Sequence, residues 1–302
     1  PWKRDVLADL IIKLREQGAG IIVIPILFSE EDRLGGDNAL TSVLEYGIVI
    51  AQVGTNNINK NSVPRGVAKI NDPLPFLFEW GGMLGPIKEF HNASGVGVSN
   101  TAPEIDGVTR RIPLLMKIGD NIYPALSMEV IRVAVGAPSY QVKSGPSGII
   151  AMRVPGFETI KTDANSRIWL RWNKDYETIS ASEDDFSKFE GKTVIIGMSA
   201  EGLAGIIATP IGERYGYELT ASTLDTVLEG KNIERIDVSF LLELVASFVL
   251  GIILILITRF LPYWFIGIKL LSWYIIAVWL SHYFFTTHLM LVDVSWILVT
   301  IT

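Results

Sequence analysis

The chain has 302 residues, of which 49% are hydrophobic and 19% charged, with a formal net charge of −6 at pH 7. This composition is too apolar for an ordinary soluble protein and too charged for an all-membrane one, and its mild acidity gives no support to a nucleic-acid partner, which needs clustered Lys and Arg. The sequence contains no cysteine, which excludes disulfides, thiolate metal sites and cysteine nucleophiles.

Helices and strands alternate at the start of the chain. Residues 5–17 place apolar side chains on one stripe of a helix, and residues 21–24 form a β-branched run typical of a strand buried on both faces. Asp37 is expected to begin a second helix, and residues 48–51 form the next strand. This order predicts an α/β fold with a mixed, largely parallel sheet covered by helices.

The same alternation returns later in the chain. Pro124 is expected at the start of a third helix, residues 193–196 form another buried strand, and residues 219–229 form a last helix before the tail. Pro- and Gly-rich loops are expected over residues 71–85 and 136–148. Antiparallel strands are expected over residues 93–98, 166–171 and 176–180.

The tail, residues 239–302, predicts an all-α transmembrane region. Its only Asp, Glu, Lys and Arg residues are Glu243, Arg259, Lys269 and Asp293. Three apolar segments follow one another, and the first two reach the roughly 20 helical residues that cross a bilayer core. They are residues 239–258, 261–285 and 289–302, the third of which is expected to be truncated. A buried helical hairpin of a soluble protein is the alternative.

We therefore divide the chain into a soluble domain, residues 1–235, which we expect to be truncated at its N-terminus, and a membrane region, residues 236–302. Arg259 and Lys269 flank the first connection between membrane segments, whereas residues 282–293 contain no Lys or Arg. Positive charge favours the cytoplasmic side, so we expect the soluble domain outside.

No motif predicts a catalytic residue or a cofactor. Residues 197–202 resemble a Gly-x-Ser-x-Gly nucleophile elbow, but the second Gly comes one residue late. Only His91 lies outside the tail to serve as a base, so a Ser199 hydrolase is disfavoured. The acidic runs 30–32 and 183–185 could bind a hard cation, but neither has EF-hand spacing, and we expect solvated loops and no metal.

Candidate ligand contacts lie in three loops at strand ends, where open α/β sheets bind their ligands. They are Ser29, Glu30 and Asp32; Asp106, Arg110 and Arg111; and Ser199 and Glu201. The alternative is structural, since Arg110 and Arg111 can simply pair with nearby acids. In the first membrane segment, Ser247 and Gly251 are four residues apart and could let two helices approach closely, although such pairs are also frequent by chance.

Several segments, in this order, resemble the CHASE2 domain, an extracytoplasmic input module of bacterial membrane receptors. Each carries part of that family's pattern, from its Pro-Trp-x-Arg start to its closing Gly-Lys and Thr-Pro motifs. They are residues 1–4, 10–14 and 18–28; 106–111 and 113–114; 123–126; and 191–197, 208–210 and 218–228.

The chain departs from the family pattern at three places. Pro25 stands where the family has Asp, residues 204–205 replace another Asp, and Tyr215 replaces a Pro. A role of those acids in holding a ligand or ion is therefore in doubt here.

The resemblance implies a receptor in the bacterial inner membrane, with a sensor outside, three membrane helices and a cytoplasmic effector. The implied effector is an adenylate or guanylate cyclase, or else a kinase, and the implied partners are an unknown small-molecule or protein ligand and a second copy in a homodimer. The alternatives are a membrane-tethered enzyme with its active site in residues 1–235 and a constitutive dimerisation module.

Overall fold

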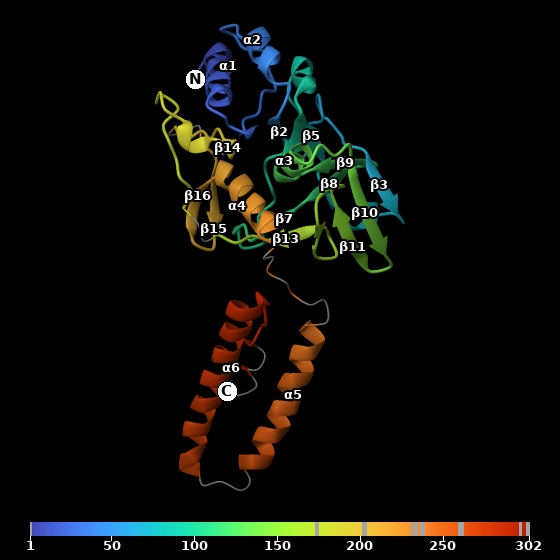
Figure 1. Ribbon diagram of the computed structural model, residues 1–302. Coiled ribbons are helices and arrows are strands. Elements are labelled where there is room, and N and C mark those ends of the chain that lie inside the picture. The colour runs from blue at the N-terminus through green and yellow to red at the C-terminus, as the bar shows by residue number, and fades with distance from the viewer. Residues whose placement is uncertain are drawn as a thin grey trace. The chain divides into compact units, whose positions relative to one another are not determined.

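The computed structural model describes residues 2–172, 175–200, 204–230, 233, 235, 239–258, 263–295 and 298–299. The chain forms two compact units, Pro1–Gly230 and Lys231–Thr302. Each unit is described separately below (Figure 1).

The first unit is built on a five-stranded central sheet. Four strands run parallel in the order β14 (Thr193–Ile195), β1 (Ile21–Ile24), β2 (Ile48–Thr55) and β6 (Gly95–Val98). The fifth, β5 (Gly82–Leu84), pairs antiparallel with the far end of β2. The predicted mixed, largely parallel sheet is therefore confirmed, and β14 lies at one edge of it.

Helices cover both faces of this sheet. The helices are α1 (Arg4–Glu16), α2 (Asp37–Val43), α3 (Leu126–Ala134) and α4 (Gly216–Leu228). The core on the α1 and α2 side contains Ile22, Ile24, Ile48 and Ile50. The core on the α3 and α4 side contains Val23, Val49 and Ala51. Successive strand residues point to opposite faces, so the continuous apolar runs of β1 and β2 supply both cores.

Smaller sheets and short 3-10 helices complete this unit. A four-stranded sheet has the order β12 (Thr159–Ile160), β11 (Gly148–Arg153), β10 (Tyr140–Gly145) and β3 (Val67–Ile70). A three-stranded sheet has the order β4 (Phe78–Glu79), β8 (Leu115–Ile118) and β9 (Asn121–Pro124). Two pairs are β13 (Arg167–Trp169) with β7 (Arg111–Pro113) and β15 (Ile206–Thr209) with β16 (Gly212–Tyr215). The 3-10 helices are η1 (Leu74–Phe76), η2 (Lys88–Asn92) and η3 (Ser187–Phe189).

Several sequence expectations need correction. Residues 176–180 form no strand, because an alternating pattern makes a strand only where a neighbouring strand supplies hydrogen bonds. The strand expected over residues 93–98 exists as β6, but it is parallel to β2. Pro124 ends β9, and α3 begins two residues later. The loops expected over residues 71–85 and 136–148 contain β4 and β5 in the first and β10 in the second.

A buried carboxylate on α3 joins four parts of the first unit. Glu129 is fully buried and accepts hydrogen bonds from Arg132 Nε at 3.0 Å and Nη2 at 2.8 Å, from Arg65 at 2.9 Å and from Tyr140 Oη at 2.6 Å. Its charge is therefore compensated by two guanidinium groups, as a buried ion requires. Gly95 of β6 packs directly against it, because an added Cβ would lie 2.9 Å from Glu129 Oε2.

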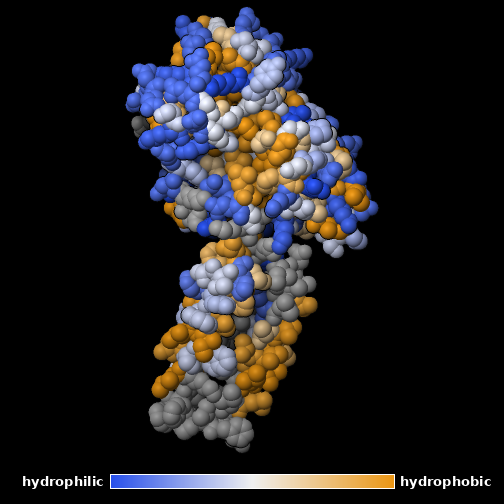
Figure 2. All heavy atoms as spheres, in the orientation of Figure 1, coloured by the Kyte–Doolittle hydropathy of each residue, from blue (hydrophilic) through white to orange (hydrophobic). Residues whose placement is uncertain are grey.

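The second unit contains two helices, α5 (Ser239–Thr258) and α6 (Tyr263–His288). Judged on the described residues, neither is long and apolar enough to span a membrane. Apolar side chains nevertheless dominate the described surface of both helices (Figure 2). Phe248, Ile255 and Leu271 are 70%, 72% and 61% exposed.

The chain after α6 does not continue as a helix over residues 289–294. Leu289 adopts a left-handed φ of 53°, and its neighbours fold back onto the unit. The amide of Asp293 donates to Glu243 Oε1 at 2.9 Å, and Ser281 Oγ donates to the carbonyl of Val292 at 3.0 Å. The third apolar segment expected from residue 289 thus begins irregularly, and much of its remainder lies outside the described residues.

Replacing Glu129 by Ala should lower the free energy of unfolding by about 3–5 kcal/mol, because it leaves the buried Arg132 and the partly buried Arg65 without their counter-ion. Urea unfolding of the full chain in mild detergent, followed by tryptophan fluorescence, measures the change. The exposed Glu158→Ala is the matched control and should change stability by less than about 0.5 kcal/mol. Equal effects of the two substitutions would contradict a central role for Glu129.

Candidate functional site

A cleft of about 1690 Å³ lies at the open edge of the central sheet. Its walls come from α1, from the segment after β1, from residues 176–181, from β14 with the segment that follows it, and from the start of α4. Because β1 and β14 are parallel, the segments that leave them emerge at the same end of the sheet. This is the end at which open α/β sheets bind ligands.

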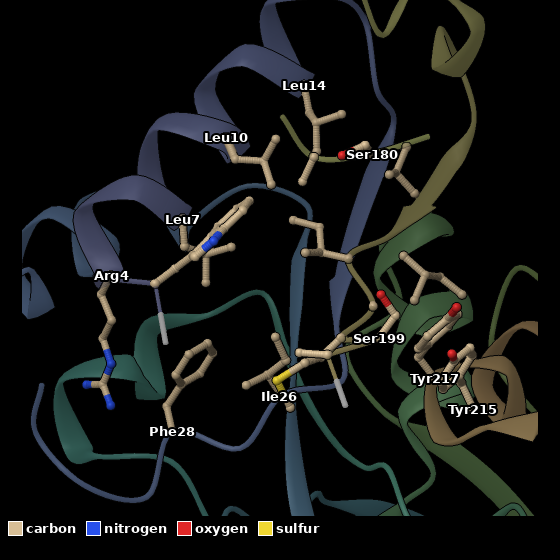
Figure 3. A pocket seen from close by; sticks show the side chains of 18 of the residues that line it. Arg4, Leu7, Leu10, Leu14, Ile26, Phe28, Ser180, Ser199, Tyr215 and Tyr217 are labelled. Atoms are coloured by element: carbon tan, nitrogen blue, oxygen red, sulfur yellow. The ribbon is translucent and has the colours of Figure 1, made fainter. Parts of the chain in front are cut away.

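One wall is the apolar stripe of α1. Leu7, Leu10 and Leu14 are spaced at i, i+3 and i+7, which places them on one helix face, and all three point from α1 toward the cleft (Figure 3). Beyond the end of β1, Ile26 and Phe28 extend this apolar surface. Apolar walls of this kind are typical of sites that bind organic ligands or peptide side chains.

The opposite wall carries the polar groups of aromatic side chains and a hydroxyl (Figure 3). The rings of Tyr215 and Tyr217 stack with centroids 5.4 Å apart, and Ser199 lies beside them on the same wall. Gly197 is required here, because an added Cβ would lie 2.5 Å from the Tyr217 ring. Burial raises the pKa of Tyr217, and burial raises that of Tyr176 to about 12, so both phenols stay neutral hydrogen-bonding groups at pH 7.

The mouth of the cleft carries charges of both signs, because Lys3, Arg4 and Arg33 line it together with Glu30, Glu31 and Asp32. Asp32 accepts hydrogen bonds from the amides of Arg4 and Leu34, each at 3.1 Å, and these amides hold its pKa below the usual value. Glu30 and Glu31 are exposed and line the same mouth. Asp32 is thus used to fix the loop, while the two glutamates are available to a ligand.

Arg4 ties the loop at this mouth to the helices. Its guanidinium pairs with Asp37 and donates to the carbonyl of Glu30. The same guanidinium lies 5.2 Å from the ring centroids of both Phe28 and Phe90, a cation–π arrangement. The loop that follows β1 is therefore held by charge as well as by packing.

The structure brings together two of the three predicted loops. Ser29, Glu30, Asp32 and Ser199 all line the cleft. Glu201 lies outside the described residues. The third loop is not among the lining residues.

The third predicted loop is an ion-pair framework. Arg110 forms a bidentate pair with Asp106, at 2.9 and 2.7 Å, and Arg111 forms one with Glu104, at 2.6 and 2.8 Å. Arg111 also lies 4.9 Å from the Trp169 ring centroid. The carboxylates already engage both guanidinium groups. These arginines therefore pair with nearby acids, as the structural alternative to ligand binding expects.

Among the described residues that line the cleft, Ser199 has no histidine beside it. Ser199 lines the cleft, whereas His91 of η2 is not among the lining residues. Within the described ranges, no group of three or more His, Cys, Asp and Glu side chains could hold a metal ion.

Sequence reasoning missed the α1 stripe and the tyrosine pair as parts of the site. The apolar spacing over residues 5–17 predicts one stripe of a helix and gives no sign that the stripe lines a cleft. The tyrosines carry a weak signal, the pattern Tyr-Gly-Tyr at residues 215–217, but their role depends on α4 facing α1 across the edge of the sheet.

The small residues of α5 occupy different environments. Ser247 is buried and donates a hydrogen bond to the carbonyl of Glu243 at 2.7 Å, within its own helix. At Gly251 an added Cβ would meet no atom within 4 Å, so the space beside it is open. Close approach of a second helix at this pair stays a prediction.

Comparison with known proteins gives one match. Residues 1–261 match the family model described as the CHASE2 domain. No curated protein and no solved structure matches the chain. The matched range includes all the residues that line the cleft.

The carboxyl of Asp106 should titrate near pH 2, because its hydrogen bonds with Arg110 lower its pKa to about 2. Its pKa is depressed in the folded state, so the pair stabilises the fold above about pH 4 and this contribution is lost as the pH falls toward 2. Carbon-13 NMR of the aspartate carboxyl groups measures the titration. In Arg110→Ala the midpoint should return toward about 3.9, and in the control Arg111→Ala it should stay low. A midpoint near 4 in the unaltered chain would contradict this ion pair.

Proposed function

The chain belongs to the CHASE2 domain family, and we propose that it is the sensory and membrane part of a bacterial signalling receptor. CHASE2 domains are extracytoplasmic sensors, and the family match supports such a role for residues 1–261. In the proposal, a small molecule or partner protein binds in the cleft, and the tail passes this event to a cytoplasmic effector. The effector would be an adenylate or guanylate cyclase or, as the second choice, a kinase.

The observation that carries the proposal is the position of α4. Tyr217, Glu218 and Ala221, near its start, line the cleft. The helix ends at Leu228, and α5 begins at Ser239, so only residues 229–238 lie between them. One helix therefore contributes to the binding site and leads into the tail through a short linker, which limits how much of a displacement a flexible segment could absorb.

The apolar surface of α5 and α6 supports a membrane location for the tail in this proposal (Figure 2). Large exposed apolar side chains such as Phe248 and Ile255 are costly in water and favourable in lipid. The proposal places these helices in the inner membrane. It places the first unit outside, because Arg259 and Lys269 flank the first connection between membrane segments in the sequence and positive charge favours the cytoplasmic side. The open space beside Gly251 leaves room for a helix of a second copy.

A polar cluster near the start of α5 is the second support for a relay. Glu243 is buried, accepts from the amide of Asp293, and has its other carboxylate oxygen 3.5 Å from Arg235. Arg235 belongs to the linker that follows α4 in sequence. A displacement of the linker would therefore act on a buried charge in the tail, where ionisable residues are most often functional.

Filling the cleft should change signalling output. In cells that express the chain followed by a cyclase reporter domain after Thr302, Ala221→Trp should alter basal cyclic-nucleotide production at least about threefold, because the indole occupies the site. Leu228→Trp, on an exposed position of the same helix, is the matched control and should leave output unchanged. Equal output from the two variants would contradict the cleft as the input site.

A flexible insertion in the linker should uncouple the site from the output. Six Gly and Ser residues inserted after Ile233 should remove the effect of Ala221→Trp in the same reporter assay. The same insertion after the exposed Gly136, in the loop between α3 and β10, should preserve that effect. A cleft effect that persists through the Ile233 insertion would show that mechanical coupling is wrong.

A further inference from the structure

A closed turn in the first unit carries a fully exposed apolar side chain. Among the described residues, Ile105 is the most exposed of all the large hydrophobic side chains. The amide of Gly107 donates to the carbonyl of Glu104 at 2.8 Å, and the amide of Glu104 donates to the carbonyl of Val108 at 3.1 Å. Gly107 has a φ of 79°, which glycine adopts without strain. Ile105 therefore stands at the tip of a turn with a defined backbone.

Both neighbours of Ile105 in the sequence are clamped by arginine. Asp106 holds Arg110 through two hydrogen bonds, and Glu104 holds Arg111 through two more. Bidentate pairs of this kind fix orientation as well as distance. A single exposed isoleucine is common on soluble proteins. One that is held on a doubly clamped turn needs little further ordering when it contacts another surface, which favours binding.

The turn lies near the place where the chain leaves the first unit. The amide of Leu170 donates to the carbonyl of Arg110 at 2.9 Å, and the next residue, Arg171, donates to Glu229 at 2.9 Å. Glu229 directly follows α4, and Gly230 is the last residue of the unit. Strands β7 and β13 accordingly lie beside the last turn of α4 (Figure 1). Two consecutive residues thus connect the Ile105 turn to the exit of the chain.

The exit is close to lipid if the tail is in the membrane, as the proposed function has it. Arg235 lies 3.5 Å from Glu243 of α5, so it already belongs to the tail. Only residues 231–234 separate it from Gly230, and covalent geometry limits the distance between Gly230 and Arg235 to about 19 Å. The surface around the exit is therefore the part of the first unit that lipid headgroups can reach.

The charges of the turn and of the segments that hold it cancel. Residues 104–111 and 163–171 together with Glu229 contain four acidic and four basic side chains. They are Glu104, Asp106, Asp163 and Glu229, and Arg110, Arg111, Arg167 and Arg171, and each has an ion pair within this set. Attraction to anionic headgroups is consequently weak here, and the apolar side chain decides which surface fits.

We propose that the Ile105 turn is a membrane contact, in which Ile105 inserts at the headgroup boundary of the leaflet that α5 enters. The partner is a lipid surface, and zwitterionic lipid suffices. The contact holds the exit end of the first unit at the bilayer, so that a displacement of α4 acts on the tail instead of tilting the whole unit. This inference rests on the proposed function, because that function places the tail in the membrane.

The absence of native cysteine allows a direct test with a single label. The full chain with Ile105→Cys carries an environment-sensitive nitrobenzoxadiazole dye and is reconstituted into phosphatidylcholine vesicles, with or without lipid that bears a spin-label quencher at the headgroup boundary. The matched control is Ile12→Cys, an exposed isoleucine of α1, which covers the opposite face of the central sheet from α4. Quenching should be at least about twofold at position 105 and less than about a tenth at position 12, because only an inserted side chain reaches this depth.

A change of lipid tests the chemistry of the contact. Replacing part of the phosphatidylcholine by phosphatidylglycerol should leave the quenching at position 105 unchanged. Absence of quenching at position 105, equal quenching at positions 105 and 12, or quenching that appears only with the anionic lipid would overturn the proposal. So would a disulfide between two unlabelled Ile105→Cys chains without lipid quenching, because the turn would then contact a second copy.

A label in the tail separates this inference from the proposed function. Phe248→Cys places the dye on an exposed position of α5, and its quencher is a lipid with the spin label deep in the acyl chain. Quenching at position 248 without quenching at position 105 would show that the tail is in lipid and the turn is not a contact. Quenching at position 105 alone would show that the turn binds lipid and the membrane location of the tail is wrong.

Discussion

The structure depends on one constraint, that a parallel sheet must be covered on both faces. The strands β14, β1, β2 and β6 place alternate residues into two cores, one beneath α1 and α2 and the other beneath α3 and α4. Each helix therefore carries an apolar stripe, and the positions of all four follow from the strands that they cover. Beside β14 the sheet ends between α1 and α4, and the cleft forms at that place.

Glu129 is a buried charged residue within an otherwise apolar core. It lies in α3, yet it contacts side chains of Arg65 and Tyr140 from distant parts of the sequence and packs on Gly95 of the central sheet. Burying this charge is costly and is offset only when all partners are in place. The network therefore fixes α3 against the sheet, and the core that α3 shares with α4 is fixed with it.

The ordered cleft and the apolar tail are joined by a short stretch of chain. At the cleft, Asp32 and Arg4 are already engaged in structural contacts, and outside it Arg110 and Arg111 form ion pairs. The groups left for a ligand are backbone groups of β14, apolar side chains, and the exposed charged residues Glu30, Glu31 and Arg33. Such a surface is suited to recognising shape and backbone rather than to chemistry on a substrate.

The sequence by itself determined the helices and strands with strong periodicity, including α1, β1 and α4, and the family to which the chain belongs, because apolar spacing and ordered motifs are local properties. The loops that follow β1 and β14 are predicted from the sequence as ligand contacts, and this stays a prediction. Only the tertiary structure decided that residues 176–180 form no strand, that β6 runs parallel to β2, and that Leu10 and Tyr217 line the same cleft. Those features depend on which segments become neighbours, and a pattern along the chain does not specify the partner across it.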